Sequence, residues 1–188
     1  MKSFSLLSSL ILFATVIFFT AYNVGAQGKS YKIGDRGPGG GYVFYDKGST
    51  SDGWQYLEAA PEDLSDGIGW YNHSFVETAA TETAIGTGKV NTKKIILAQG
   101  EGNYAAILCV RYTGGGQSDW FLPSKDELCV MLTNLEKAGT GGLSGTNYWS
   151  STENSEYVVW IKSFACGNRA SSLSDDLSRK RVRAVRSF

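Results

Sequence analysis

The stretch SDWFLPSKDEL, residues 118–128, marks the place where a loop becomes a helix. Pro123 fits just before a helix but not inside one, because its ring fixes φ and it has no N–H to donate. Ser124 followed three residues later by Glu127 is the pattern of a capping box, in which each side chain accepts a hydrogen bond from the other residue's backbone N–H. Asp126 adds negative charge at the positive end of the helix. The charges of this stretch therefore have a structural explanation and need no catalytic one.

We expect this stretch to act as a hinge of the fold. Trp120 and Leu122 are predicted to face the core, while Asp119 holds the preceding loop in place. After the capping box, apolar residues recur at helical spacing and predict the inner face of a helix: Leu128, Met131, Leu132 and Leu135. The predicted hinge consists of Asp119, Trp120, Pro123, Ser124 and Glu127.

The segments around the hinge predict a loop-rich α+β domain. Aromatic and β-branched residues predict strands at residues 42–45, 54–60, 157–164 and 180–188, and residues 148–152 enter a further strand. Two further helices are predicted, one that begins at residue 89 and turns Ile95, Ile96 and Leu97 inward, and one at residues 104–112. Residues 62–88 and 139–147 are interpreted as loops. The expected architecture is a twisted antiparallel sheet packed against two or three helices.

Residues 1–26 have the layout of a secretory signal peptide. Lys2 gives a positive start, residues 6–20 are apolar, and Val24, Gly25 and Ala26 place small residues before the expected cleavage site. The alternative is a retained membrane anchor, but the apolar run is shorter than the ~20 residues that span a bilayer. We therefore expect a single domain at residues 27–188 that is secreted, periplasmic or at the cell surface, with no stable membrane insertion after cleavage.

Composition narrows the classes of function. The chain has 18 basic and 18 acidic residues, so it offers no overall electrostatic reason to bind nucleic acid. Its single histidine, His73, lies in a polar stretch, and neither H-E-x-x-H nor Cys-x-x-Cys occurs. No catalytic residue, metal site or cofactor is predicted. Two carboxylates in a cleft could still serve an enzyme, and Asp63, Asp66 or Asp119 could supply calcium ligands, although no EF-hand-like loop is present.

The three cysteines allow one disulfide with one thiol left over. Export favours an oxidising compartment, but a buried cysteine also behaves as a small apolar residue. Any pair among Cys109, Cys129 and Cys166 remains open.

Five segments in order resemble the Lcl C-terminal domain family of exported bacterial proteins: YKIGDRGPGGGYVFYDKG, GWQYLEAAPEDL, YTGGGQSDWFLPSKDELCVM, YWSST and RVRAVRSF. The resemblance covers about residues 31–188. It implies a cell-envelope or extracellular domain of a family long described as a domain of unknown function. The collagen-like adhesin that gives the family its name is associated with adhesion and with sulfated glycosaminoglycans, but this chain lacks the collagen repeats.

A more distant similarity links the chain to the C-type-lectin-like superfamily, including its formylglycine-generating branch. The W-x-L-P helix start, the W-S-S strand and the closing V-R-x-V-R strand carry it. It implies a helix packed on a twisted antiparallel sheet, with the two chain ends together. The calcium-binding sugar motifs of C-type lectins are absent, and the paired catalytic cysteines of the formylglycine-generating enzymes have no counterpart.

These observations favour a non-catalytic binding or adhesion module for glycans or another surface partner. Aromatic rings can stack on sugars, and arginine can bind sulfate or carboxylate through paired hydrogen bonds. The predicted ligand-binding residues are Trp70, Tyr71, Trp149, Glu153, Arg179, Arg181 and Arg183. The alternative is that the aromatics pack in the core and that the arginines pair with Asp126, Glu127, Asp175 or Asp176.

Two other functions remain open. The chain could be a structural or assembly domain of a surface complex, which would form an oligomer without a small ligand. The third is an uncharacterised enzyme with a fold like that of the formylglycine-generating enzymes.

Overall fold

The computed structural model describes residues 29–143, 147–155, 158–162, 170–173 and 179–188. Every helix and strand lies in one compact unit, Tyr31–Phe188. Residues 1–26, predicted to be a signal peptide, lie outside the described residues. Among the residues that are described, no helix combines the length and the apolar character needed to cross a membrane.

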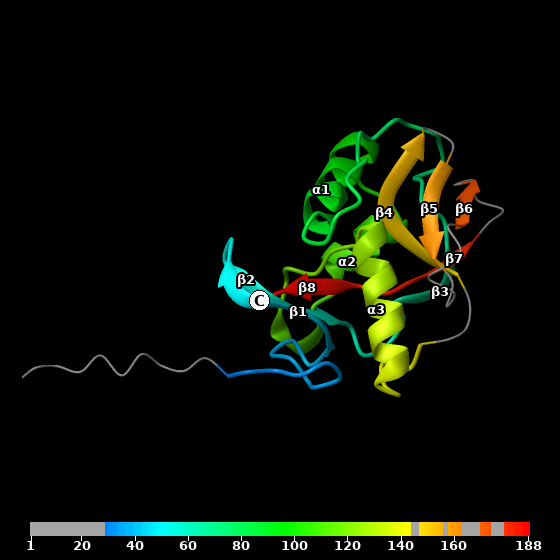
Figure 1. Cartoon of the computed structure of the whole chain (residues 1–188). Coiled ribbons are helices and arrows are strands. Elements are labelled where there is room, and N and C mark those ends of the chain that lie inside the picture. Colours follow the sequence, from blue (N-terminus) through cyan, green and yellow to red (C-terminus); the bar gives the residue numbers. More distant parts are fainter. Residues whose placement is uncertain (1–28, 144–146, 156–157, 163–169, 174–178) are drawn as a thin grey trace, which may run out of the picture. The chain divides into compact units, whose positions relative to one another are not determined.

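The first sheet is antiparallel and contains β1 (Tyr42–Ser51), β2 (Trp54–Ala59) and β8 (Val185–Ser187) in the order β1-β2-β8 (Figure 1). A two-residue turn joins β1 to β2, with Asp52 at φ 53° and Gly53 at φ 80°. Asp-Gly accepts positive φ at both positions, which matches the right-handed twist of a hairpin. The turn chemistry therefore fixes the register of this hairpin.

The second sheet has the order β3-β7-β4-β5-β6. Its strands are β3 (Ser65–Ile68), β7 (Lys180–Val182), β4 (Tyr148–Ser155), β5 (Val158–Lys162) and β6 (Ala170–Leu173). The pairs are antiparallel except β4 and β7, which run parallel with Tyr148 opposite Arg181. The α+β prediction is thus confirmed at the level of a mixed helix and sheet fold, whereas the single antiparallel sheet is wrong.

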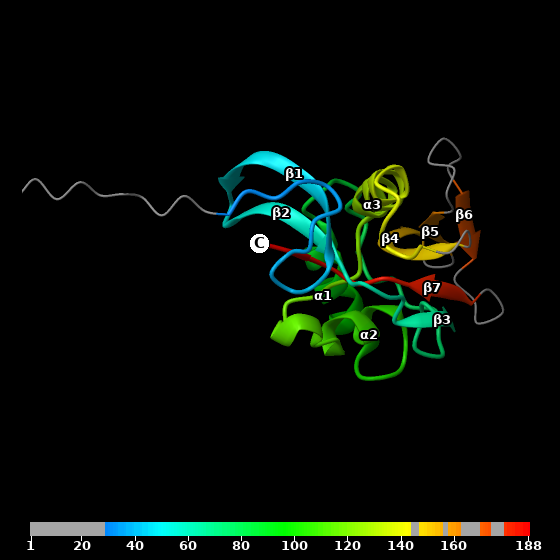
Figure 2. The same cartoon turned by 90° about the horizontal axis from the view of Figure 1, so that it is seen from below.

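One continuous C-terminal segment connects the two sheets. The sequence predicts a single strand at 180–188, but the segment is β7 and β8 separated by Arg183 and Ala184. Figure 1 labels both strands, and Figure 2 shows the red segment running from β7 to the C-terminus. The Arg183 side chain is buried, and the Ala184 carbonyl accepts a hydrogen bond from the Ala60 N–H at 2.8 Å. At Arg183 and Ala184 the chain therefore makes contacts outside both sheets, and the strand is interrupted there.

In the described segments, three α-helices accompany the sheets: α1 (Gly88–Gln99), α2 (Ala105–Arg111) and α3 (Lys125–Lys137). A helix turns about 100° per residue, so three consecutive residues cannot share one face. Ile95 is fully buried, Ile96 is partly buried, and Leu97 is 88% exposed, which makes the inward prediction wrong for Leu97. Polar Asn91 and Thr92 complete the buried face of α1.

The predicted capping box is present at the start of α3. The Ser124 hydroxyl accepts a hydrogen bond from the Glu127 N–H at 3.3 Å, and the Ser124 N–H donates to Glu127 Oε2 at 2.7 Å. Asp119 accepts two hydrogen bonds from Arg186, at 2.6 and 3.1 Å. Burial alone would raise the pKa of Asp119, but these hydrogen bonds and the positive charge of Arg186 lower it overall. Asp119 therefore holds its loop against the C-terminal strand, as predicted.

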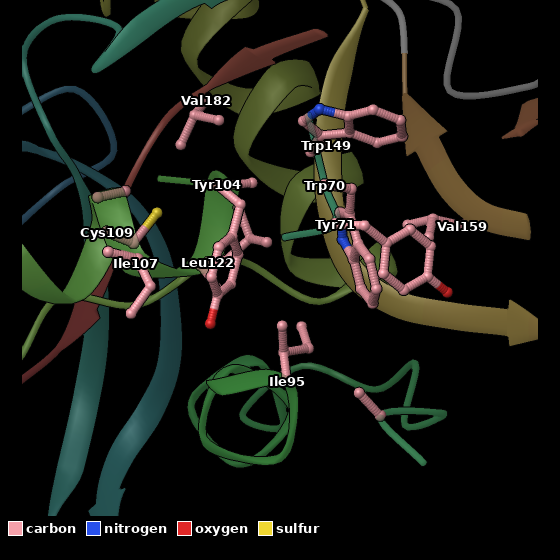
Figure 3. Close-up of a cluster of buried hydrophobic side chains, with 14 of the residues drawn as sticks. Trp70, Tyr71, Ile95, Tyr104, Ile107, Cys109, Leu122, Trp149, Val159 and Val182 are labelled. Atoms are coloured by element: carbon pink, nitrogen blue, oxygen red, sulfur yellow. The ribbon is translucent and has the colours of Figure 1, made fainter. Parts of the chain in front are cut away.

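The hinge lies between two hydrophobic clusters. Trp120 and Leu122 belong to the cluster that contains Trp70 and Trp149, of which Figure 3 labels Leu122, Trp70 and Trp149. The intervening Phe121 belongs to the cluster beneath the first sheet and α3. Alternate side chains of an extended segment point to opposite sides, so one short stretch joins both clusters. The backbone of Phe121 also pairs with Val185.

We expect Trp120→Ala to lower the free energy of unfolding by about 3–5 kcal/mol, the usual cost of truncating a buried Trp. Trp120 is 1% exposed, and its indole N–H donates to the Gly114 carbonyl at 3.2 Å. Urea denaturation measures the loss. Phe75→Ala is the control, because Phe75 is 47% exposed. Equal unfolding midpoints for the two variants would contradict the role of Trp120 in the hinge.

Glu127 predicts a pH dependence of stability. Burial raises its pKa from 4.5 to about 7, against the opposing effect of backbone N–H donors from Ser124, Gly86 and Gly88. A carboxyl group with a raised folded pKa retains protons that the unfolded chain loses, so stability falls as pH rises from 4.5 to about 7. We expect urea denaturation to show a steeper fall in that interval for the wild type than for Glu127→Gln. If the stability of the two proteins changes with pH in the same way, the predicted effect of Glu127 is wrong.

Candidate functional site

The aromatic residues predicted to bind a ligand lie in the core. Trp70 and Trp149 are fully buried, and Tyr71 is 5% exposed (Figure 3). The Trp70 indole N–H donates to the Ser150 carbonyl at 2.8 Å, and that of Trp149 donates to the Ile68 carbonyl at 2.7 Å. The prediction fails because residues 65–68 form β3 and join the second sheet, which carries the following Trp70 inward.

Glu153 holds the irregular segment around Thr78 by hydrogen bonds and is not available to a ligand. Its buried carboxylate accepts hydrogen bonds from the Thr78 N–H and hydroxyl, each at 3.0 Å, and from the Tyr71 hydroxyl at 3.2 Å. These donors satisfy the hydrogen-bonding capacity of the buried carboxylate. Glu153 therefore belongs to the framework, contrary to its predicted role.

Arg183 is also part of the framework. Its side chain is completely buried, and its Nε donates to Asp63 Oδ1 at 2.7 Å. Its Nη1 donates to the carbonyls of Ala60 at 2.9 Å and Gly141 at 2.6 Å. The partner is thus Asp63, and neither Asp126 nor Glu127 takes that role. Asp175 and Asp176, which were also considered, lie outside the described residues.

Arg181 shares the same carboxylate but reaches the surface. Its Nη1 lies 3.2 Å from Asp63 Oδ2, and its side chain is 28% exposed. The Tyr148 hydroxyl also donates to Asp63 Oδ2, at 3.1 Å. Asp63 therefore contacts both arginines and the Tyr148 hydroxyl.

Arg179 stands between two cavities and is exposed. It lines a cavity of about 210 Å³ together with Asp66, Asn147, Lys180 and Arg181. It also lines a cavity of about 540 Å³ whose wall includes β3, Tyr71, His73 and Asn103. Over the described parts of the chain, Arg179 has neither a hydrogen bond nor an ion pair. We call Arg179, Lys180 and Arg181, with Asn147, the basic edge.

In the described chain, cationic side chains at and beneath the basic edge outnumber the carboxylates. Among the described residues there, Arg179, Lys180, Arg181 and Arg183 accompany only two carboxylates, Asp63 and Asp66. Lys180 Nζ lies 5.8 Å from the centre of the Trp149 ring. A guanidinium beside an ammonium group suits the binding of sulfate, phosphate or carboxylate.

Other chemistry has less support at this edge. Within the described segments, no group of three metal-ligating side chains occurs. His73 is exposed at φ 70° on the wall of the larger cavity. Cys109 is a free thiol whose pKa is raised by complete burial, so it is a poor nucleophile. The open pairing of Cys129 and Cys166 involves a residue outside the described chain, Cys166.

Comparison with protein-family models finds no matching family, and a search of curated proteins finds no match. The site is therefore interpreted from its own geometry.

Sequence reasoning missed two residues of this region. Asp63 was considered only as a calcium ligand, because nothing local connects it with Arg183, 120 residues away. Asn147 lay in a glycine-rich loop with no motif around it. The run of basic residues before the final strand was the available signal, and it located Arg179 and Arg181.

We expect Arg183→Ala to lower the free energy of unfolding by about 3–5 kcal/mol, because it leaves the largely buried Asp63 without its main partner. The matched variant Arg179→Ala should change stability by no more than about 0.5 kcal/mol, as is usual for an exposed residue. Urea denaturation of both variants measures how much each arginine contributes to the free energy of unfolding. If both variants unfold like the wild type, the framework role of Arg183 is wrong.

Proposed function

We propose that the chain is an exported, non-catalytic binding module that holds an acidic glycan of the cell surface or its surroundings at the basic edge. The observation that carries the proposal is Arg179, an exposed guanidinium that lines two cavities and has no ionic or hydrogen-bonded partner in the described chain. Framework contacts do not explain its position, whereas an anionic ligand would.

The charge balance supports an acidic ligand over a neutral one. Arg179 and Lys180 can both turn toward a bound group, while Arg183 and Asp63 keep the strand beneath them in place. Binding to a polyanion at such a surface depends on salt, because exposed charges are screened by ions. The buried Trp70 and Trp149 leave no support for ring stacking at these two positions.

We further propose a C-type-lectin-like fold and membership of the Lcl C-terminal domain family. The joined ends of the compact unit support this: the Tyr31 and Phe188 rings meet edge to face with centres 5.2 Å apart. Packing of α3 beside both β1 and β4 agrees with a helix laid on a sheet. The resemblance supplies the exported location and the class of ligand.

An assembly domain is the second candidate function. Val90 is 51% exposed and Leu97 is 88% exposed. They are seven residues apart on α1, which places them about two turns apart on one face. Exposed apolar side chains of this kind occur at contacts between proteins.

The test is binding of the purified protein to an array of sulfated, carboxylated and neutral glycans at low and physiological salt. We expect salt-sensitive binding to acidic glycans, weakened at least about tenfold in the double variant Arg179→Ala and Lys180→Ala. The charge-matched control changes two exposed lysines elsewhere, Lys32→Ala and Lys137→Ala.

Equal binding by the two double variants would remove the basic edge from the proposal. Salt-insensitive binding to neutral glycans would contradict the acidic ligand. Failure to bind any glycan, together with a mass that grows with protein concentration, would favour the assembly domain.

A further inference from the structure

A third cavity, of about 450 Å³, lies beside the first sheet and shares no lining residue with the basic edge. Its walls come from the β1–β2 turn, from α1, from the hinge and from β8. Trp54, Lys89, Lys93, Asp119 and Ser187 are the lining residues used below. The volume falls in the range of ordinary ligand sites.

On the side of β8 away from β2, Val185 is paired, but the Ser187 backbone has no hydrogen bond to any described residue. Phe188 exchanges both backbone hydrogen bonds with Tyr56, at 2.9 and 3.0 Å, on the side of β2. Val185 exchanges both of its bonds with Phe121 on the opposite side, at 2.8 and 3.0 Å. Backbone groups alternate sides along a strand, so the N–H and C=O of Ser187 point away from β2, toward the cavity that Ser187 lines.

The charges of the cavity favour an acidic occupant. Asp119 is bound by Arg186, and Asp52 lies 3.7 Å from Lys47, so both lining carboxylates have a cationic partner. Lys89 and Lys93 are exposed, and neither forms an ion pair or hydrogen bond within the described residues. The charge of Lys89 also helps to lower the pKa of Asp119. Four residues apart on α1, they present two ammonium groups on one face.

An apolar wall completes the cavity. Trp54 is half-buried, and Lys47 Nζ lies 3.8 Å above the centre of its ring. A Cβ added at Gly86 would lie 3.2 Å from Trp54 Cζ2, so the ring packs closely against that backbone. Val90, 51% exposed, lines the cavity from α1. The wall is therefore in place without a ligand.

We propose that this cavity binds an extended acidic segment of a partner protein, which adds to the open edge of β8. The segment pairs its backbone with Ser187, directs acidic side chains to Lys89 and Lys93, and places an apolar side chain against Trp54 and Val90. Edge addition supplies affinity through main-chain hydrogen bonds and specificity through alternate side chains. The inference does not depend on the glycan function of the basic edge.

The test is selection of a displayed random heptapeptide library on the immobilised protein, followed by affinity measurements on synthetic, end-blocked copies of the enriched peptides. We expect enriched peptides to combine Asp or Glu with β-branched or aromatic residues. Their affinity should fall at least about tenfold in the double variant Lys89→Gln and Lys93→Gln. The variants Lys32→Gln with Lys137→Gln, and Arg179→Ala with Lys180→Ala, should bind as the wild type does.

Methylation of the peptide's backbone nitrogens, one at a time, tests the edge pairing. We expect one or more methylated positions to abolish binding, since the added methyl removes a donor to the Ser187 carbonyl. The proposal would be overturned if no peptide is enriched or if the Lys89 and Lys93 variant binds the peptides as the wild type does. Equal affinity of all methylated peptides would overturn it as well. Loss of glycan binding in the Arg179 variant with peptide binding intact separates the two sites.

Discussion

The fold depends on two arginines of the final segment that are buried with their charge. Arg186 bridges Glu58 and Asp119, at 2.8 and 2.6 Å, and Arg183 is held by Asp63. A buried guanidinium is tolerated only where it is paired and hydrogen-bonded. The three carboxylates come from β2, from the hinge and from the loop after β2. Moving the C-terminal segment would therefore leave each of these carboxylates without its arginine partner. This constraint explains why one short segment can join two sheets.

Buried glutamates extend the same principle to the loops. Glu58 accepts hydrogen bonds from the Gly39 and Gly41 N–H groups, at 2.8 and 2.9 Å. A Cβ at Gly39 would lie 2.8 Å from Glu58 Oε1, so the loop can close on the carboxylate only without a side chain there. Glu127 holds the Gly86 N–H at 2.8 Å, and Glu153 holds Thr78. Part of the glycine content therefore reflects close packing of backbone around buried acids.

Local chemistry could be predicted from the sequence, and distant pairing could not. The capping box at Ser124 and Glu127 and the burial of Trp120 follow from neighbouring residues, and both are confirmed. The break of the last strand and the burial of Arg183 depend on Asp63, whose position in space no nearby residue reveals. Trp70, Tyr71 and Trp149 pack in the core, which is the alternative that the sequence left open. The strand β3, within the predicted loop 62–88, is a further feature that depends on distant pairing.

Within the described chain, basic residues fall into two groups, those paired inside the fold and those exposed without an internal partner. A charged group that the fold needs has its partners inside the chain, as Arg183 and Arg186 do. Arg179 and the Lys89–Lys93 pair lack such partners among the described residues, although each lines a cavity. Charges left without an internal partner attract anions from outside. Lys89 and Lys93 lie on α1 and Arg179 precedes β7, so the two groups lie on different elements. On our two proposals, acidic ligands bind at two separate surfaces, one at the basic edge and one that adds the backbone of Ser187 in β8.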